Sequence, residues 1–299
     1  MKVNGILIDD TFAEAFGMAG TGVIITADTM KWARIAATTM AGFGTSVIGA
    51  GAEVGIDREL KPEETPDGRP GVRVLLFGFS PDAASAQLKT RVGQCVLTSP
   101  GSACYAGLDG AERLNLGNAL RYFGDGWQIS KRFGAKHYWR IPVMDGEFVC
   151  EATTGLTKEA VGGGNLLILA ATTRNALAAA QVAVAAIERL PDVIAPFPGG
   201  IVRSGSKVGS KYKSVRASTN EAYCPTLRGA VNTALDDAAA SVLEIVIDGL
   251  TPDAVAAAMR AGLAAIVKLG PKRGAIRVSA GNYGGKLGPH HFHLRKLRP

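Results

Sequence analysis

Hydrophobic residues in this chain of 299 residues gather in short continuous runs, and these runs alternate with stretches of helical spacing. Residues 22–57 have the order strand, helix, glycine turn, strand, and residues 166–204 repeat that order. Short apolar runs bounded by turn residues are typical of buried strands, whereas apolar residues three to four positions apart are typical of helices. The pattern therefore predicts a protein in which strand–helix–strand units recur.

The recurrence continues downstream as an alignment without gaps. Residues 73–97 match residues 244–268 at a constant offset of 171. In both copies a hydroxyl residue, Ser80 or Thr251, comes directly before a proline and an aspartate. This order is typical of a helix N-terminus, because the hydroxyl caps a free N–H, proline has no N–H to lose, and an acid suits the helix dipole. We therefore expect an α+β fold with two ferredoxin-like (split βαβ) subdomains from an internal duplication.

A segment without a counterpart, residues 101–150, separates the two copies and is rich in aromatic residues. Helical spacing at residues 111–122 and strand alternation at residues 137–143 indicate an ordered insertion. We expect an N-terminal lobe of residues 1–150, which includes the insertion, and a C-terminal lobe of residues 151–299. The aromatic side chains favour a contact with another subunit as much as an internal core.

Composition restricts the class of protein. A content of 47% hydrophobic residues and 38 glycines suits a globular protein with one large core or two moderate ones. No uncharged apolar run reaches the roughly 20 residues that a membrane span needs, and acids near the N-terminus argue against a signal peptide. We therefore expect a cytoplasmic protein without a membrane partner.

Charge is unevenly distributed along the chain. Residues 1–150 hold 15 Lys or Arg against 16 Asp or Glu, whereas residues 151–299 hold 18 against 10. A basic half favours an anionic partner, such as nucleic acid, a phosphate or a polycarboxylate. Residues 195–226 combine five Lys or Arg with many Ser, Thr and Gly, and no acid precedes Glu221 in this stretch. We interpret it as a loop that binds an anionic substrate.

Several common kinds of site do not fit the sequence. Residues 49–55 (GAGAEVG) miss the dinucleotide-binding spacing, and residues 205–211 (GSKVGSK) miss the spacing of a phosphate-binding loop, so we expect neither NAD nor ATP. The cysteines show no spacing typical of metal ligands and favour buried thiols; they are Cys95, Cys104, Cys150 and Cys224. Three close histidines, His290, His291 and His293, are interpreted as residues of a last strand. We expect no metal and no tightly bound cofactor.

One carboxylate lies within an apolar strand. Residues 242–247 read VLEIVI, and Glu244 lies between Val242 and Val246 on its own face. On a covered strand, desolvation raises the pKa of a carboxyl group, and a protonated carboxylic acid can donate a proton in catalysis. A solvated carboxylate at a sheet edge is the alternative. A nucleophilic Cys224 is a second one, although no His between His137 and His290 could serve as its base.

Nine segments of the chain resemble the formylmethanofuran–tetrahydromethanopterin formyltransferase family. They span nearly the whole sequence, at residues 10–16, 42–48, 63–72, 123–126, 195–204, 206–211, 217–220, 222–226 and 279–288. The resemblance implies a homotetramer of chains with two ferredoxin-like lobes. It also implies transfer of a formyl group between N5 of tetrahydromethanopterin and the amine of a methanofuran-type coenzyme, with Glu244 as the proton carrier.

The basic composition sets this chain apart from acidic archaeal relatives, and it is similar to the bacterial methylotroph form of the family. That form implies further subunits of a formyltransferase/hydrolase complex, in which the formyl group passes from the pterin to the furan coenzyme and leaves as formate. Because both coenzymes carry anionic groups, we expect hydroxyl, amide and basic side chains to bind them. These expected substrate-binding residues are Arg203, Ser204, Ser206, Lys207, Ser210, Lys211, Ser218, Thr219, Asn220, Asn282 and Lys286.

Two alternatives from other classes remain open. The chain could be a non-catalytic scaffold that binds only the coenzyme tail. It could also be a basic RNA-binding module, since ferredoxin-like sheets bind RNA, but it lacks the aromatic sequence pattern of such domains. We therefore expect no nucleic-acid partner.

Overall fold

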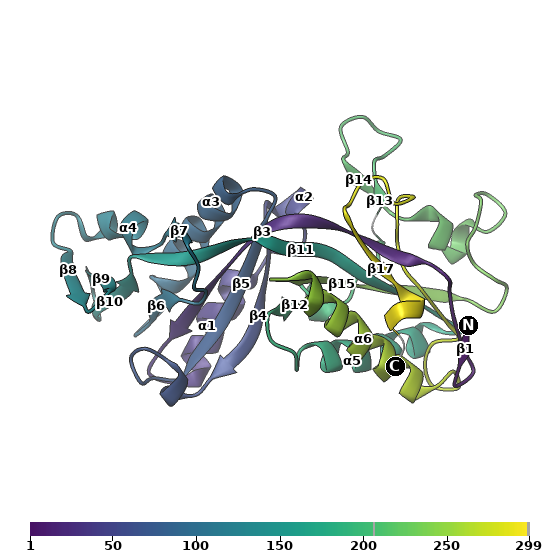
Figure 1. Ribbon diagram of the computed structural model, residues 1–299, viewed down its shortest axis with the longest axis horizontal. Coiled ribbons are helices and arrows are strands. Elements are labelled where there is room, and N and C mark those ends of the chain that lie inside the picture. The colour runs from purple at the N-terminus through teal and green to yellow at the C-terminus, as the bar shows by residue number, and fades with distance from the viewer. Residues whose placement is uncertain (206, 298–299) are drawn as a thin grey trace. The chain divides into compact units, whose positions relative to one another are not determined.

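The chain folds as a mixed α+β protein with helices packed on a large mixed β-sheet (Figure 1). The computed structural model describes residues 1–205 and 207–297. Two compact units make up the chain: unit 1 is Met1–Gly17 with Val161–Pro299, and unit 2 is Met18–Ala160. The expected lobe boundary after residue 150 thus lies inside unit 2, and the first 17 residues belong with unit 1.

Unit 2 contains four α-helices and the strands β4 to β10. Two long strands, β3 (Phe12–Thr26) and β11 (Thr153–Ala170), contribute to both units. The helices of unit 2 are α1 (Met30–Ala41), α2 (Val47–Ala50), α3 (Pro81–Arg91) and α4 (Gly117–Leu120). Its strands are β4 (Glu53–Leu60), β5 (Gly71–Gly78), β6 (Ala103–Ala106), β7 (Glu112–Asn115), β8 (Ile129–Phe133), β9 (Lys136–Val143) and β10 (Gly146–Glu151).

Unit 1 is built around two longer helices, α5 (Thr173–Ile187) and α6 (Pro252–Leu269). Its strands are β1 (Lys2–Val3), β2 (Ile6–Ile8), β12 (Val193–Ile194), β13 (Lys207–Val208), β14 (Ala217–Ser218), β15 (Ser241–Gly249), β16 (Arg277–Ser279) and β17 (His290–His293).

The two units share one strand order. In unit 2 the order is β6, β3, β5, β4, all antiparallel neighbours, and α1 and α3 pack against β5. In unit 1 the order is β16, β11, β15, β12, again antiparallel, and α5 and α6 pack against β15 and each other. Each unit has its own apolar core between helices and sheet, with Met40 and Leu88 buried in unit 2 and Met259 and Leu263 in unit 1.

The helix starts that the sequence predicts are confirmed. Ser80 Oγ accepts a hydrogen bond from the N–H of Ala83 at 3.1 Å, and Pro81 begins α3. Thr251 Oγ1 accepts from the N–H of Ala254, also at 3.1 Å, and α6 begins at the following proline. The same local chemistry therefore starts α3 in unit 2 and α6 in unit 1.

The insertion is ordered, as expected, but one of its elements differs. The strand expected at residues 137–143 is present as β9. The helix expected at residues 111–122 is wrong over its first half, because residues 112–115 form β7 and pair with the first residues of β11. Only Gly117–Leu120 is α-helical there. Hydrogen bonds to a distant strand outweigh local helical spacing at this position.

Candidate active site

Glu244 lies in the middle of β15, where backbone hydrogen bonds hold it on both sides. It is paired with Leu167 of β11 on one side. On the other, the N–H of Val202 donates to the carbonyl of Glu244 at 2.7 Å, and the N–H of Glu244 donates back to the carbonyl of Val202 at 2.9 Å. Only 3% of Glu244 is exposed. The alternative of a solvated carboxylate at a sheet edge is therefore excluded.

A cavity of about 30 Å³ lies against Glu244 within unit 1. Its lining brings Glu244 together with three of the expected substrate-binding residues, Arg203, Ser204 and Asn220. The cavity has room for about one water molecule, so by itself it does not enclose a large ligand. The polar loop and the apolar strand, which are separate in the sequence, thus meet at the carboxyl group.

Other expected substrate-binding residues contact the loop itself. Lys207 forms an ion pair with Glu221, which lowers the pKa of Glu221 through a side-chain hydrogen bond. Three hydroxyl groups bond to nearby backbone: Ser210 Oγ accepts from the N–H of Tyr212 (3.1 Å), Ser218 Oγ donates to the carbonyl of Gly209 (2.9 Å), and Thr219 Oγ1 donates to the carbonyl of Ser204 (2.5 Å). These four side chains shape the loop around the short hairpin of β13 and β14.

Three cations remain exposed at the surface of unit 1. Arg203, Lys211 and Lys286 have no acidic partner among the residues that the structure describes. They can therefore reach an anionic ligand without first breaking an ion pair. Ser206, another expected contact, lies outside the described residues.

A second buried carboxylate, Glu14 of β3, organises the glycine-rich segment 282–288. Its Oε2 accepts hydrogen bonds from the N–H groups of Tyr283 (2.6 Å) and Gly285 (2.8 Å), and its Oε1 accepts from those of Leu287 (2.6 Å) and Gly288 (2.8 Å). Burial raises the pKa of Glu14, but these four hydrogen bonds outweigh it and lower the pKa to about 2. Glu14 is therefore an ionised anchor around which the segment folds.

The same segment requires glycine at a close approach. A Cβ atom at Gly288 would lie 2.3 Å from the carbonyl oxygen of Ala15, so no other residue fits there. Asn282, an expected substrate contact, donates from Nδ2 to Thr11 Oγ1 at 3.0 Å and accepts from the N–H of Gly284 at 3.2 Å. Asn282 thus helps to hold the segment against the start of β3.

Tyr283 is a residue of this site that the sequence reasoning missed. Burial, followed by the charge of Glu244, raises the pKa of the Tyr283 phenol, and the phenol also hydrogen-bonds the backbone of Val208. The phenol is therefore a neutral donor in the electrostatic reach of Glu244. A signal was available for Glu14, which, like Glu244, is a lone acid in an apolar strand; for Tyr283 the only signal was its place within a glycine-rich segment.

The cysteines and the three histidines near the C-terminus lie in packed or loop positions. Cys104 and Cys150 are buried as expected, but Cys95 and Cys224 are only partly so. Cys224 Sγ lies 3.5 Å from the carbonyl of Asn220 and 3.6 Å from Thr219 Oγ1, in contact with the loop. The expected last strand is present as β17, which pairs with β3, and two of its histidine rings pack on Phe12.

The described residues contain neither a cluster of metal-ligand side chains nor a helix that could span a membrane. Across residues 1–205 and 207–297, no group of three or more His, Cys, Asp or Glu side chains is placed to hold a metal ion. Over the same residues, no helix combines the length and apolar character needed to cross a bilayer.

Comparison with known families covers nearly the whole chain. The family model described as formylmethanofuran-tetrahydromethanopterin formyltransferase matches residues 1–143, and the model described as its proximal lobe matches residues 146–297. The chain therefore belongs to the formylmethanofuran–tetrahydromethanopterin formyltransferase family.

Individual relatives are similar to this chain over nearly their full lengths. A formylmethanofuran–tetrahydromethanopterin formyltransferase of Methylobacillus flagellatus is 60% identical over 301 residues, with 99% of each chain covered. The crystal structure of the formyltransferase/hydrolase complex of Methylorubrum extorquens with methylofuran contains a chain that is 57% identical, with a TM-score of 0.97 and coverage of 100% of this chain and 99% of that one. The formyltransferase of Methanosarcina barkeri is 44% identical, with a TM-score of 0.93 and coverage of 99% and 100%.

Proposed function

We propose that this protein is a formyltransferase that moves a formyl group between N5 of tetrahydromethanopterin and the amine of a methanofuran-type coenzyme. Family membership and full-length similarity to proteins of that name support the reaction class. One observation supports a role for particular residues: the carboxyl group of Glu244 is buried beside a cavity that residues of the polar loop also line. Both coenzymes act as substrates, and the proposed chemistry needs no further cofactor.

The proposed transfer is direct. N5 attacks the formyl carbon, a tetrahedral oxyanion forms, and the bond from carbon to the amine breaks as that nitrogen gains the proton lost by N5. In this proposal the buried Glu244 carries a proton, so that it can donate a hydrogen bond to the oxyanion and pass a proton to the leaving amine. The reverse reaction uses the same groups, with the amine as the attacking atom.

Tyr283 is the second donor in this proposal. Because burial raises the pKa of its phenol, Tyr283 stays neutral and is suited to donate a hydrogen bond to the oxyanion beside the acid. Holding two large coenzymes in contact supplies the positioning part of catalysis, and preorganised donors supply the electrostatic part.

Anionic groups of the coenzymes are assigned to the exposed cations. Arg203 is placed best, because it lines the cavity of Glu244 and has no acidic partner within the described chain, whereas Lys211 and Lys286 are candidates for the coenzyme tails. Ser204 and Asn220 are candidates for contacts near the reacting atoms, since they line the same cavity. The remaining expected residues support the loop that presents these groups.

We also infer that the two units are copies of one ferredoxin-like motif. Both have the order fourth, first, third, second strand, with two helices packed on the sheet. The alignment of residues 73–97 with residues 244–268 supports the duplication. The division between the two family models at residues 143 to 146 supports sequence lobes of residues 1–150 and 151–299. In space, residues 1–17 belong to unit 1 together with most of the second lobe.

A complex is the proposed working form. A chain that is 57% identical belongs to a formyltransferase/hydrolase complex, and this similarity supports association of the present chain with other subunits of that kind. The homotetramer implied by the family resemblance is part of the same proposal. Physiological direction follows from the partner: a subunit that hydrolyses the formylated furan coenzyme draws transfer from the pterin.

The test is formyl exchange by the purified chain between formyl-tetrahydromethanopterin and the furan coenzyme. Glu244→Gln should lower the rate by about 100-fold or more, since removal of one preorganised donor costs about 2.7 to 4 kcal/mol of barrier. Tyr283→Phe should have a smaller effect and lower kcat by about 10-fold, which corresponds to about 1.4 kcal/mol. The exposed Glu188→Gln is the matched control.

Each outcome separates the candidates. A Glu244→Gln protein as active as the wild type would remove Glu244 from the mechanism while leaving the reaction class intact. An inert wild type that stays inert after assembly with the hydrolase subunits, yet binds the furan coenzyme, would instead establish the scaffold alternative.

A further inference from the structure

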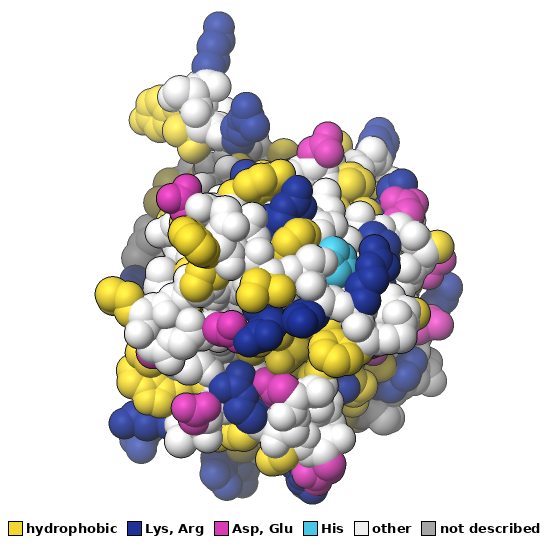
Figure 2. All heavy atoms as spheres, turned by 90° about the vertical axis from the view of Figure 1, so that its left-hand side faces the viewer, with side chains coloured by type: hydrophobic (Ala, Val, Ile, Leu, Met, Phe, Trp, Pro, Cys, Tyr) yellow, Lys and Arg dark blue, Asp and Glu magenta, His cyan; other side chains and the backbone are white. Residues whose placement is uncertain are grey.

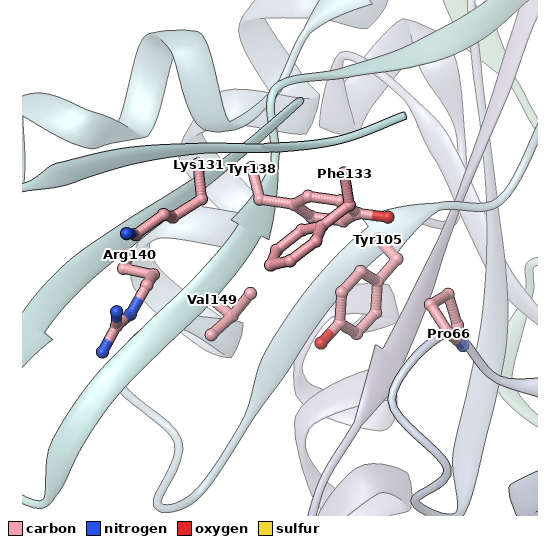
Figure 3. A pocket seen from close by; sticks show the side chains of 7 residues that line it. All are labelled: Pro66, Tyr105, Lys131, Phe133, Tyr138, Arg140 and Val149. Atoms are coloured by element: carbon pink, nitrogen blue, oxygen red, sulfur yellow. The ribbon is translucent and has the colours of Figure 1, made fainter. Parts of the chain in front are cut away.

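Unit 2 contains a pocket that the proposed chemistry does not use. It has a volume of about 340 Å³ and opens beside the strands β8, β9 and β10. Figure 3 shows its seven lining side chains, which are Pro66, Tyr105, Lys131, Phe133, Tyr138, Arg140 and Val149. A volume near the lower end of the usual range for small-molecule sites suits a single ring system with one substituent.

Aromatic rings form the walls. The centroids of Tyr105 and Tyr138 lie 6.1 Å apart with an interplanar angle of 73°, and those of Phe133 and Tyr138 lie 6.0 Å apart at 59°. Both pairs have edge-to-face or tilted geometry, which leaves ring faces available to a further aromatic group. Phe133 is 71% exposed, so most of its apolar surface faces water until a ligand covers it.

The floor of the pocket is rigid. Tyr105 is only 4% exposed, and its hydroxyl donates to Asp67 Oδ2 at 3.1 Å. Asp67 in turn accepts from Arg69 Nε at 2.9 Å and from Thr26 Oγ1 at 2.7 Å. The negative charge next to Tyr105 is therefore compensated, and it does not repel an anion from the pocket.

Cations lie at one end of the pocket. Lys131 and Arg140 extend side by side from β8 and β9, away from Pro66 (Figure 3). Arg140 is paired with Glu147, with Nε and Oε2 2.6 Å apart. Lys131 has no ion-pair partner in the described part of the chain. A charged ligand group can therefore pair with Lys131 at once.

The strand register explains why these groups share one face. Side chains two residues apart on a strand point the same way, so Lys131 lies beside Phe133, and Tyr138 beside Arg140. Lys131 is directly opposite Tyr138 in the pairing of β8 with β9. Residues 126–144 contain four Lys or Arg and no Asp or Glu. Figure 2 views the molecule from this side, where hydrophobic and basic side chains lie next to one another.

We propose that this pocket binds a planar aromatic group that carries a carboxylate or a phosphate. The ring packs against the exposed surface of Phe133, beside Tyr138 and Tyr105. Its anionic group pairs with Lys131, with Arg140 as a second cation. The two parts of such a ligand match the two parts of the pocket: the ring contacts the aromatic side chains, and the anionic group contacts the basic ones. The aromatic anion can be a free metabolite or the ring portion of a coenzyme substrate.

The first arm of the test measures binding of phenyl phosphate to the full chain by calorimetry and by changes in tyrosine resonances. Benzyl alcohol supplies a ring without charge, and inorganic phosphate supplies charge without a ring. Phenyl phosphate should bind about 10-fold more tightly than either, because stacking and ion pairing act together. Inorganic phosphate that binds as tightly as phenyl phosphate would overturn the proposal.

Variants locate the binding. Lys131→Gln should weaken the binding of phenyl phosphate by about 2- to 5-fold, as expected for a single exposed ion pair, and leave the binding of benzyl alcohol unchanged. Phe133→Ala should weaken the binding of both phenyl phosphate and benzyl alcohol by about 3- to 10-fold. The controls are Lys89→Gln and Phe79→Ala, an exposed cation and an exposed ring of unit 2 outside the pocket. Equal effects of the pocket variants and their controls would refute the assignment.

A second arm distinguishes the two sources of the ligand. Phenyl phosphate is added to the formyl exchange assay at its own dissociation constant. Competition with one coenzyme, lost in Phe133→Ala, identifies the ring portion of that coenzyme as the occupant. Binding without competition identifies a separate metabolite.

Discussion

Strands β15 of unit 1 and β5 of unit 2 align in sequence, yet they hold opposite charges at the matching position. In β15 this residue is Glu244, which is buried at the edge of a polar cavity. In β5 it is Arg73, whose Nη1 lies 3.0 Å from Asp57 Oδ2 and whose Nε donates to the carbonyl of Gly107 at 2.8 Å. Asp57 has no exposed side-chain surface. One backbone thus supports an ion pair in one unit and a candidate acid beside a cavity in the other.

The difference indicates which buried charges serve stability and which serve chemistry. Arg73 and Asp57 neutralise each other, so neither gains from contact with a ligand. Glu244 lines a cavity together with Arg203 of the loop. Arg203 is exposed, so it can bind an anionic substrate. Neighbouring loops, and not the strand itself, therefore set the role of the residue.

The largest expected effect comes from breaking the ion pair. Arg73→Met should lower the free energy of unfolding by about 3 kcal/mol, because the buried Asp57 carboxylate then loses its ion pair with the Arg73 guanidinium. Urea unfolding measures this loss, and the formyl transfer rate per folded molecule should stay near that of the wild type.

Glu244→Gln is the matched control for that experiment, since it changes the aligned residue. It should change the free energy of unfolding by less than about 1 kcal/mol while lowering activity. If both substitutions destabilised the protein equally, the contrast between a structural and a chemical charge would be wrong.

A smaller effect is expected from the second buried carboxylate of unit 1. Glu14→Gln should lower the free energy of unfolding at pH 7 by about 1 to 3 kcal/mol, because some of the four N–H groups lose their acceptor. It should also lower kcat, since Tyr283 is held by this contact. The exposed Glu188→Gln should have neither effect.

The pH dependence of this difference has a definite sign. The pKa of Glu14 is about 2 in the folded chain against an ordinary value of 4.5. Its contribution is therefore complete above pH 4.5 and is lost as the pH falls toward 2. Urea unfolding of wild type and Glu14→Gln at pH 7 and pH 3 should show a smaller difference at pH 3, and a difference that grew would contradict the ionised anchor.

The smallest effect concerns the exposed cations of unit 1. Lys211→Gln should weaken the binding of a polyglutamyl coenzyme by about 2- to 5-fold at low salt, as expected for one solvated charge. The Debye length is about 10 Å at an ionic strength of 0.1 M. The difference in affinity should therefore fade as the ionic strength rises well above about 0.1 M. Lys268→Gln, an exposed lysine of α6, is the control, and an equal effect there would show that only net charge matters.

Much of the fold could be predicted from the sequence because its signals are local. The caps at Ser80 and Thr251 and the apolar runs of β5 and β15 depend on neighbours within a few residues. The assignment of the first 17 residues to unit 1 was not accessible in this way. It depends on pairing of β17 with Phe12–Ala15, across nearly the whole chain, and a sequence pattern does not encode such a register.

The site divides in the same manner. Glu244 could be singled out as a candidate because an acid among apolar strand residues is unusual, and residues 195–226 because of their basic, glycine-rich composition. The structure brings residues of both to one cavity, while their roles stay predictions. Sequence reasoning could not tell which loop side chains face outward, since Lys207, Ser218 and Thr219 bond to their own loop only in the folded geometry. The role of Glu14 depends on contacts about 270 residues away and becomes visible only in three dimensions.

The reciprocal pair of backbone hydrogen bonds between Val202 and Glu244 has a consequence for amide hydrogen exchange. Neither amide proton can reach solvent unless the start of the loop separates from β15, so the two protons should exchange at one common, slow rate. Exchange at these two amides therefore reports whether the backbone of the acid stays fixed when a ligand binds to the loop.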